Sequence, residues 1–477
     1  MTAQQELTAG ESASGHLKRN TIGIPGMVFM VVAAAAPLTA MASNLSLGLA
    51  FGVGSGMVGL LLLVGALLAI FTAGYVVLSR RVFNAGAYYA FIGFGLGLGK
   101  ATGSGAAFVA TIAYNLAAGG MIAATGYFTD IAVSTYMGIH LPWYLYGAVA
   151  LAVTAALGYI GVGIAKTVTT VISVAQFAII IWLGIAIMIQ RPDGFSLDVF
   201  SPERMFHGNI ALSLVFCILS FSGFEATAIY GEEAKAARRS IQVATYSALA
   251  LLVLVFMGST WSIVAAFDDI QTVAAEDPGS LIFRTADIYL GTWAGGALSV
   301  IVAFSFLASG VAFHNMASRY MFALGRSRLL PSRFATVHRR YGTPYISGAV
   351  QIAISIIVLA PFVIAQSDPI IDLFPAVSGI TSLSLTALMI GCCISVVTAS
   401  FKGLVNEGIW SARLAPTIAG VGLTSICAII IAHYQEVTGS DSLVVALMPL
   451  LPVIGAIYGA VIYRRGRGRD LEQHLAE

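Results

Sequence analysis

The sequence contains little charge. Only 10% of its 477 residues are Asp, Glu, Lys or Arg and 58% are hydrophobic, whereas soluble domains have roughly 25% charged residues. This balance excludes a water-soluble globular protein. The formal net charge is +2, and the basic residues are scattered between apolar runs. A nucleic-acid-binding face is therefore excluded, because it would need clustered Lys and Arg with interleaved aromatic residues.

Cysteine is also scarce, and the four cysteines lie inside apolar runs, at Cys217, Cys392, Cys393 and Cys427. Without CxxC spacing, neither a disulfide framework nor a zinc site is expected. The glycine-rich stretch GFGLGLGKATGSG, from Gly93, fails the phosphate-loop pattern at Phe94 and Ala101. No His/Glu metal pair or Ser/His/Asp order is present either, so we expect no enzyme activity, no metal and no cofactor.

Apolar runs of about 20 residues are abundant, and this length crosses a hydrocarbon core about 30 Å thick. We predict an all-α integral membrane protein with twelve transmembrane helices, at about 22–50, 56–79, 101–129, 142–160, 165–190, 208–233, 240–266, 288–319, 345–366, 371–399, 413–433 and 442–463. The polar residues 1–21 are interpreted as a cytoplasmic N-terminal tail, because no apolar core precedes Ile22.

The basic residues predict the orientation of these helices. With both termini in the cytoplasm, 21 of the 24 lysines and arginines fall on the inner side, as the positive-inside rule requires. The exceptions are Arg191, Arg204 and Arg284. We therefore expect a multi-pass protein of the cell (inner) membrane.

One carboxylate, Glu225, remains inside a predicted span, in the stretch SFSGFEATAIYGEEAKAARRSI. An ionised carboxylate at the bilayer centre costs roughly 2.5–3.5 kcal/mol. The neighbouring Gly223 has low helix propensity, and Ser222 and Thr227 can serve freed backbone groups. We interpret this stretch as a break in the sixth span, with Glu225 bonded to unwound backbone. The alternative is that Glu225 reaches water near the inner end of the helix.

The first span offers a counterpart in MVVAAAAPLTAMASN, where Pro37 removes a backbone donor. A lone proline is usually an ordinary kink. However, Pro37 follows Ile22 by 15 residues, as Gly223 follows Gly208, and matching interruptions predict an inverted repeat with a site at mid-membrane. The predicted parts are a first five-helix repeat at 22–190, a second at 208–399, helices 11 and 12 at 413–463, and a basic cytoplasmic C-terminal tail at 464–477.

Unwound helices expose backbone donors and acceptors that carry partial charge from the helix dipole, so backbone alone can bind a zwitterion. Apart from Glu225, no charged residue lies deep in a predicted span, which disfavours a polyamine ligand. The substrate carboxylate is predicted to bind near the first break, at Ala34, Ala35, Ala36, Pro37, Leu38 and Thr39. The amino group is predicted to bind near Phe221, Ser222, Gly223, Phe224 and Glu225. Phe221 and Phe224 could equally be ordinary core residues.

The stretch around Glu225 resembles the sixth-helix signature of the amino acid/polyamine/organocation permeases. NMASRYMFALGRSRLLP followed by TPYISGAV resembles their loop between helices 8 and 9. The resemblance spans essentially the whole chain. It implies a leucine-transporter-like fold, a 5+5 inverted repeat with broken helices 1 and 6 plus two C-terminal helices, in which a bundle moves against a scaffold.

Two departures from this family limit what the resemblance implies. Many relatives have a Gly-Ser-Gly-like first break, where this chain has AAAAPLTA. Several have a lysine midway along the fifth helix, where an approximate alignment places Gln176, which cannot titrate. Glu225 is therefore the first candidate for proton coupling, whereas Lys166 begins its span and is expected to extend to the cytoplasm.

Four further polar residues are candidates. Tyr114 and Asn115 lie midway in the third span, near a substrate-facing asparagine of the family, with interhelical hydrogen bonding as the alternative. His314 and Asn315 lie near the inner end of the eighth span, where a packing or gating hydrogen bond is favoured over a proton relay.

These features predict a secondary active transporter, a permease that moves a small neutral or zwitterionic amino acid by alternating access, either proton-coupled or exchanging. An amine or polyamine carrier and a facilitative channel-like pore are the alternatives. The expected partners are a small-molecule substrate and membrane lipid, without nucleic acid, in a monomer or a homodimer.

Overall fold

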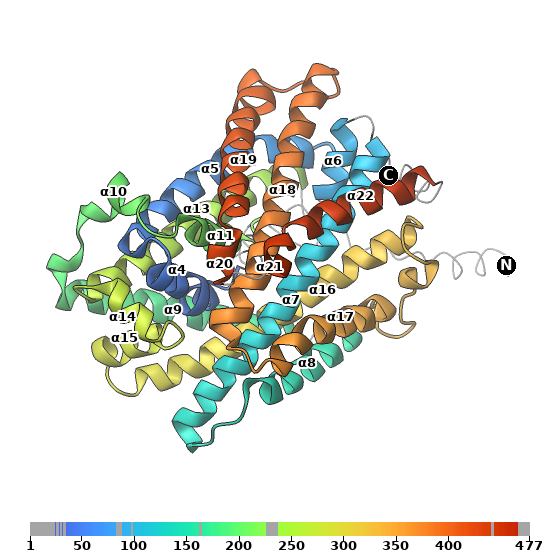
Figure 1. Cartoon of the computed structure of the whole chain (residues 1–477). Helices are drawn as coiled ribbons and strands as arrows, with labels where there is room; N and C mark the ends of the chain where they lie inside the picture. Colours follow the sequence, from blue (N-terminus) through green and yellow to red (C-terminus); the bar gives the residue numbers. More distant parts are fainter. Residues whose placement is uncertain are drawn as a thin grey trace, which may run out of the picture.

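The computed structural model describes residues 35–82, 88–96, 99–161, 165–225, 237–439 and 443–465, together with Ile24, Val28 and Val31. Throughout this part of the chain the regular structure is helical (Figure 1). The predicted N-terminal tail and the predicted site residue Ala34 lie outside the described residues. So does the predicted C-terminal tail, except for its first two residues.

Eight of the described helices are long and apolar enough to cross a membrane. They are α5 (Met57–Ser79), α7 (Gly99–Met137), α8 (Trp143–Ile160), α13 (Ala237–Ala266), α16 (Ala294–Arg326), α17 (Tyr345–Ile364), α18 (Phe374–Phe401) and α19 (Ala415–Ala432). A ninth span results if α9 (Ala165–Gln190) and the segment Pro192–Phe200, bent from it by 102°, are counted together. The chain is thus a multi-pass membrane protein, and the count of twelve spans stays a prediction.

Shorter elements complete the described chain. Two apolar helices of intermediate length are α11 (Ile210–Phe221) and α22 (Leu450–Arg464). The other α-helices are α3 (Pro37–Ala40), α4 (Ser46–Phe51), α6 (Tyr88–Leu96), α10 (Pro202–Met205), α14 (Ile270–Glu276), α15 (Leu281–Leu290), α20 (Tyr434–Thr438) and α21 (Leu443–Leu447). Three π-helical turns are η2 (Met41–Leu45), η8 (Pro369–Leu373) and η9 (Trp410–Leu414). The 3-10 turns are η3 (Gly54–Gly56), η4 (Pro192–Gly194), η5 (Leu197–Phe200) and η7 (Ser332–Ala335).

The helices α7, α8, α16 and α17 pack against one another along one side of the molecule (Figure 1). Phe128 of α7 stacks on Phe306 of α16, with ring centroids 4.8 Å apart. The approach of α7 to α8 depends on Gly126, because a Cβ there would lie 3.0 Å from the backbone nitrogen of Gly147. We call these four helices the scaffold.

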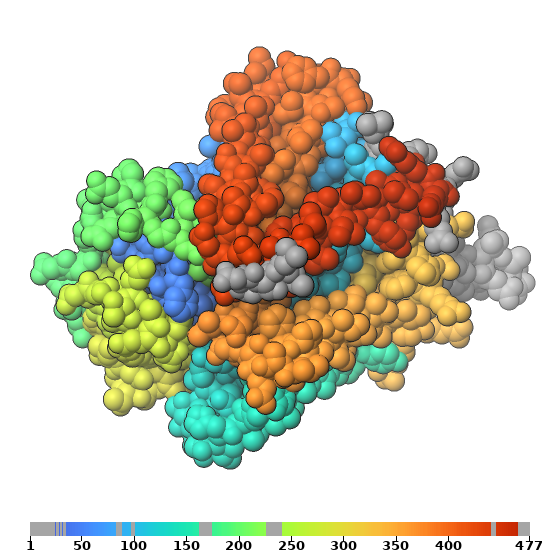
Figure 2. All heavy atoms as spheres, in the orientation of Figure 1, coloured from blue at the N-terminus to red at the C-terminus, as the bar shows by residue number. Residues whose placement is uncertain are grey.

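A second group consists of α5, α11 and α13, which pack on one another beside the interrupted first helix. We call it, with α3, η2 and α4, the bundle. On the face shown in Figure 2, α22 crosses over α7, where Phe108 meets Tyr458 edge to face at 5.2 Å.

Apolar side chains cover much of the outside of these helices. On α8 and α17, Val149 is 63% and Ile357 is 69% exposed. Large contiguous apolar surfaces are not stable in water, so these faces fit contact with lipid.

Candidate functional site

The first helix is interrupted at Ala36, where the predicted break lies. Ala36 has the left-handed conformation φ 42°, ψ 72°, which residues with a Cβ rarely adopt, and Pro37 cannot donate a backbone hydrogen bond. Helix α3 begins directly afterwards. The backbone N–H and the hydroxyl of Thr39 both donate to the carbonyl oxygen of Ala36, at 2.9 and 2.7 Å.

Gln176 of α9 lies against this break. Its Oε1 accepts a hydrogen bond from the backbone N–H of Leu38 at 3.3 Å, and its side chain is buried. The residue that sequence alignment placed beside the first break is therefore in contact with it. Its carboxamide supplies an acceptor without a charge.

The sixth predicted span is interrupted after Phe221, where α11 ends. Gly223 has a φ of 108°, a conformation that glycine adopts at little cost. The carboxylate of Glu225 folds back, and its Oε2 accepts from the backbone N–H of Gly223 at 2.8 Å. Glu225 is only 2% exposed, so the alternative in which it reaches water is wrong.

Two tyrosines fix Glu225 from neighbouring helices. The hydroxyl of Tyr114, on α7, donates to Glu225 Oε1 at 3.1 Å. The hydroxyl of Tyr75, on α5, donates to the backbone carbonyl of Glu225 at 2.8 Å. The second break is therefore held by its own carboxylate, by the scaffold and by the bundle.

A small cavity lies beside both breaks. It has a volume of about 20 Å³ and is lined by Ala35, Thr39, Ala40, Ser43, Asn44, Met121, Leu219, Ser220, Ser222, Ser309 and Phe313. This volume holds about one water molecule. A solute the size of an amino acid can enter only if the surrounding helices move.

Comparison with known protein families shows which family the chain belongs to. The model of a family described as amino acid permeases matches residues 22–457. The chain belongs to this family. The matched region includes both helix interruptions and the cavity beside them.

Individual relatives match over shorter stretches. The permease is 31% identical over 192 residues to an uncharacterised transporter of Rhizobium meliloti (strain 1021). This alignment covers 40% of this chain and 41% of the relative. It is 22% identical over 241 residues, 47% of this chain and 50% of the relative, to a branched-chain amino acid permease of Bacillus subtilis (strain 168). It is 27% identical over 157 residues, 32% of this chain and 25% of the relative, to the chloroplastic cationic amino acid transporter 7 of Arabidopsis thaliana. These alignments thus span a quarter to a half of each relative.

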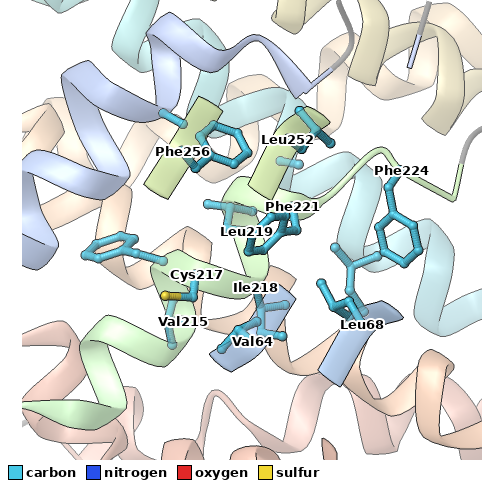
Figure 3. Packing of buried hydrophobic residues seen from close by; sticks show 14 of the residues in the cluster. Val64, Leu68, Val215, Cys217, Ile218, Leu219, Phe221, Phe224, Leu252 and Phe256 are labelled. Atoms are coloured by element: carbon cyan, nitrogen blue, oxygen red, sulfur yellow. The ribbon is translucent and has the colours of Figure 1, made fainter. Parts of the chain in front are cut away.

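Several predicted site residues lie elsewhere in the permease. Phe221 packs edge to face on Phe256 of α13 at 5.5 Å, and Phe224 packs on Phe71 of α5 at 6.2 Å. Figure 3 shows both rings within the apolar core, with Phe224 beside Leu68. Neither phenylalanine lines the cavity. Among the described residues, the aromatic ring that lines it is Phe313 of α16.

The remaining predicted polar residues also lie away from the cavity. Asn115 donates through its Nδ2 to the carbonyl of Thr111 at 2.7 Å. The ring Nδ1 of His314 bonds to Gln351 Oε1 of α17, so His314 joins two scaffold helices, and Asn315 beside it is half-buried. The bond of His314 suits packing, whereas Asn115 Oδ1 is buried without a partner among the described residues, and the roles of these residues in transport stay predictions.

The sequence interpretation missed the polar residues Asn44 and Ser309. Asn44 was visible as an isolated carboxamide in a run of small residues, but its direction depends on the π-helical turn η2. Ser309 is one of many serines in apolar helices, and only its position opposite Asn44 and Ser222 distinguishes it.

A larger pocket of about 300 Å³ lies between η3, α10 and α14, where Ser55, Arg204 and Gln271 line it. Its Arg204 is 60% exposed and pairs with Asp198 at 2.8 Å. Because this pocket adjoins neither break, we regard the smaller cavity as the candidate site.

Proposed function

We propose that this chain is a secondary active transporter that moves a small neutral or zwitterionic amino acid by alternating access. The observation that carries the proposal is the pair of helix interruptions beside one enclosed cavity. Broken helices supply backbone donors and acceptors without the cost of buried side-chain charges. Relatives named as amino acid permeases and transporters support an amino acid as the substrate.

In the proposed complex, the substrate carboxylate binds the backbone that follows Pro37. Among the described residues, the N–H of Leu38 donates to Gln176 Oε1 at 3.3 Å, at the long end of the hydrogen-bond range, so a carboxylate could replace this weak neutral acceptor. The segment from Pro37 to Phe51 is helical through α3, η2 and α4, and its dipole favours an anion at this end.

The substrate ammonium group binds backbone carbonyls at the end of α11. The carbonyls of Leu219 and Phe221 each accept one N–H, from Ser222 and Phe224 respectively. A carbonyl oxygen has two lone pairs, so each can accept a further donor. Glu225 keeps this turn open through its bond to Gly223.

The predicted topology is supported by contacts of the two ends of α8 with loops that adjoin other predicted spans. Segments predicted to be inside contact one another, as in the hydrogen bond between Tyr159 and His338 at 2.9 Å. Segments predicted to be outside do the same, as in the bond from Trp143 to Ser367 at 3.3 Å. We propose on this basis a leucine-transporter-like 5+5 repeat with twelve spans and cytoplasmic termini.

The alternatives differ in what the cavity must contain. A polyamine carrier would need carboxylates, and within the described residues the cavity lining contains none. A channel-like pore would need an open path, whereas about 20 Å³ holds about one water.

Transport by the purified protein in liposomes tests the proposal. We expect saturable uptake of at least one amino acid, and counterflow when the same amino acid is loaded inside. We also expect that amino acid to raise the melting temperature in a concentration-dependent way. Uptake without saturation or counterflow would favour a pore, and stabilisation by polyamines alone would favour the amine carrier.

A further inference from the structure

We propose that the transported amino acid has a small, neutral side chain ending in a hydroxyl or carboxamide group, and that Asn44, Ser222 and Ser309 recognise it. This inference rests on the proposed transport of amino acids and names the class of side chain. It arises from three buried oxygen atoms around the cavity that have no hydrogen-bond partner among the described residues: Asn44 Oδ1, Ser222 Oγ and Ser309 Oγ.

The orientation of the Asn44 carboxamide follows from its neighbours. The hydroxyl of Ser220 donates its single proton to the carbonyl of Phe216 at 2.7 Å. Ser220 Oγ can therefore only accept from Asn44, and Asn44 Nδ2 lies 3.2 Å from it. The other end of the carboxamide, Oδ1, is an acceptor without a partner in the described structure, so it can accept a hydrogen bond from a ligand.

The π-helical turn η2 (Met41–Leu45) contributes to this arrangement. Single π-turns within helices often occur at functional sites. Two serines hold the widened turn, because Ser43 Oγ donates to the carbonyl of Thr39 at 2.8 Å and Ser46 Oγ to that of Met41 at 2.6 Å. With this turn in place, Ala40, Ser43 and Asn44 all border the cavity.

Other helices supply the remaining walls of the subsite. Ser222 follows α11 and Ser309 lies midway along α16, and they are 6% and 3% exposed. Both have hydroxyls that can donate or accept. Met121, Leu219 and Phe313 close the rest of the cavity with apolar atoms, which favours a short side chain.

This chemistry discriminates between classes of side chain. An aliphatic side chain would leave Asn44 Oδ1 and the two hydroxyls buried without partners, and unsatisfied buried polar atoms are costly. A cationic side chain would need a carboxylate, which the described cavity lining lacks. A hydroxyl or carboxamide gives Asn44 the donor it needs and also offers an acceptor to a serine.

Isosteric amino acids provide the test. L-threonine and L-valine have almost the same shape, as do L-asparagine and L-leucine, and each is added as an unlabelled competitor in liposome uptake by the wild-type protein. We expect the polar member of each pair to compete at least about tenfold better, because a site built around hydrogen bonds rejects the analogue that lacks them.

Two variants with a matched control locate the effect. Asn44→Leu preserves the shape of the side chain but removes its acceptor, and Ser309→Ala removes one hydroxyl. Both should reduce the preference for threonine over valine towards one. The control is Ser384→Ala on α18, which removes another buried hydroxyl without a partner in the described structure, away from the cavity. Its preference should match that of the wild type.

The outcomes separate this inference from the proposed function. If no amino acid is transported or stabilises the protein, the proposed function fails and this inference fails with it. If amino acids are transported but valine and leucine compete as well as threonine and asparagine, only this inference is overturned. An unchanged preference in Asn44→Leu and Ser309→Ala would also overturn it. Loss of preference in these two, with Ser384→Ala unchanged, supports it.

Discussion

Replacing Glu225 tests whether the second helix interruption depends on a carboxylate or only on its hydrogen bonds. Glu225→Ala leaves the N–H of Gly223 without its acceptor and removes the carboxylate from the hydroxyl of Tyr114, which keeps a hydrogen bond with Tyr320. An unsatisfied buried donor costs about 1–3 kcal/mol, so the variant loses about this amount locally. If Glu225 is ionised, removing its charge returns roughly 2.5–3.5 kcal/mol. The two terms are similar, so folding should largely survive while the shape of the break does not.

Glu225→Gln separates the two possibilities. Its Oε1 can accept from Gly223 and its Nε2 can donate to the Tyr114 oxygen, because a tyrosine hydroxyl can also accept. Both bonds are then kept without a charge. We expect Glu225→Ala to insert normally but lose uptake, and Glu225→Gln to retain uptake. Tyr114→Phe removes one of the two bonds and should give an intermediate rate.

The assay is initial uptake rate in liposomes, normalised to the amount of inserted protein, with melting temperature measured in parallel. If Glu225→Ala transports normally, the carboxylate does not maintain the site. If Glu225→Gln is as inactive as Glu225→Ala at every pH, the charge itself is required, and proton coupling through this residue becomes the better explanation.

Two further predictions concern positions outside the cavity. Gly158→Ala on α8 places a Cβ 2.6 Å from Cδ2 of His314. We therefore expect the free energy of unfolding to fall by about 1–3 kcal/mol, measured by thermal unfolding. The control is Gly258→Ala on α13, where an added Cβ meets no neighbouring atom within 4 Å, and it should be neutral or stabilising. In the loop before α14, hydrogen bonds from the side chain and backbone of Thr272 lower the pKa of Asp269 below its ordinary 3.8. The stability contributed by this cap is therefore complete at neutral pH and decreases as the pH falls through the lowered pKa. In the wild type, amide hydrogen exchange in α14, corrected for the intrinsic exchange rate, should be faster below about pH 3.8 than at neutral pH. In Asp269→Ala, the corrected exchange rate should not depend on pH in this way.

The two interruptions were predictable because each breaks a local rule. Pro37 cannot complete a helical hydrogen-bond pattern, and Glu225 next to Gly223 is too costly for an uninterrupted apolar helix. Those signals lie within a few residues of chain. The contact of Gln176 with the first break was anticipated from family alignment, since periodicity alone gives no information about a partner 138 positions away.

The lining of the cavity was less predictable, because it depends on how helices rotate about their axes. Phe221 and Phe224 flank the break in sequence, yet α11 turns both rings into the core (Figure 3). Asn44 faces the cavity beside a π-helical turn that sequence patterns do not indicate. Phe313 lines the cavity although its neighbour His314 bonds to another helix.

The two interruptions also differ in what holds them, and this difference suggests where the proposed transport cycle must break a contact. The first is fixed by Thr39, within its own segment, and by Gln176 of α9. The second is bonded by Tyr75 of α5, in the bundle, and by Tyr114 of α7, in the scaffold. If the bundle moves against the scaffold, the bond from Tyr75 can travel with Glu225, whereas the bond from Tyr114 crosses the moving boundary. A single hydrogen bond contributes about 0.5–1.5 kcal/mol, which is enough to favour one state and small enough to be broken in each cycle.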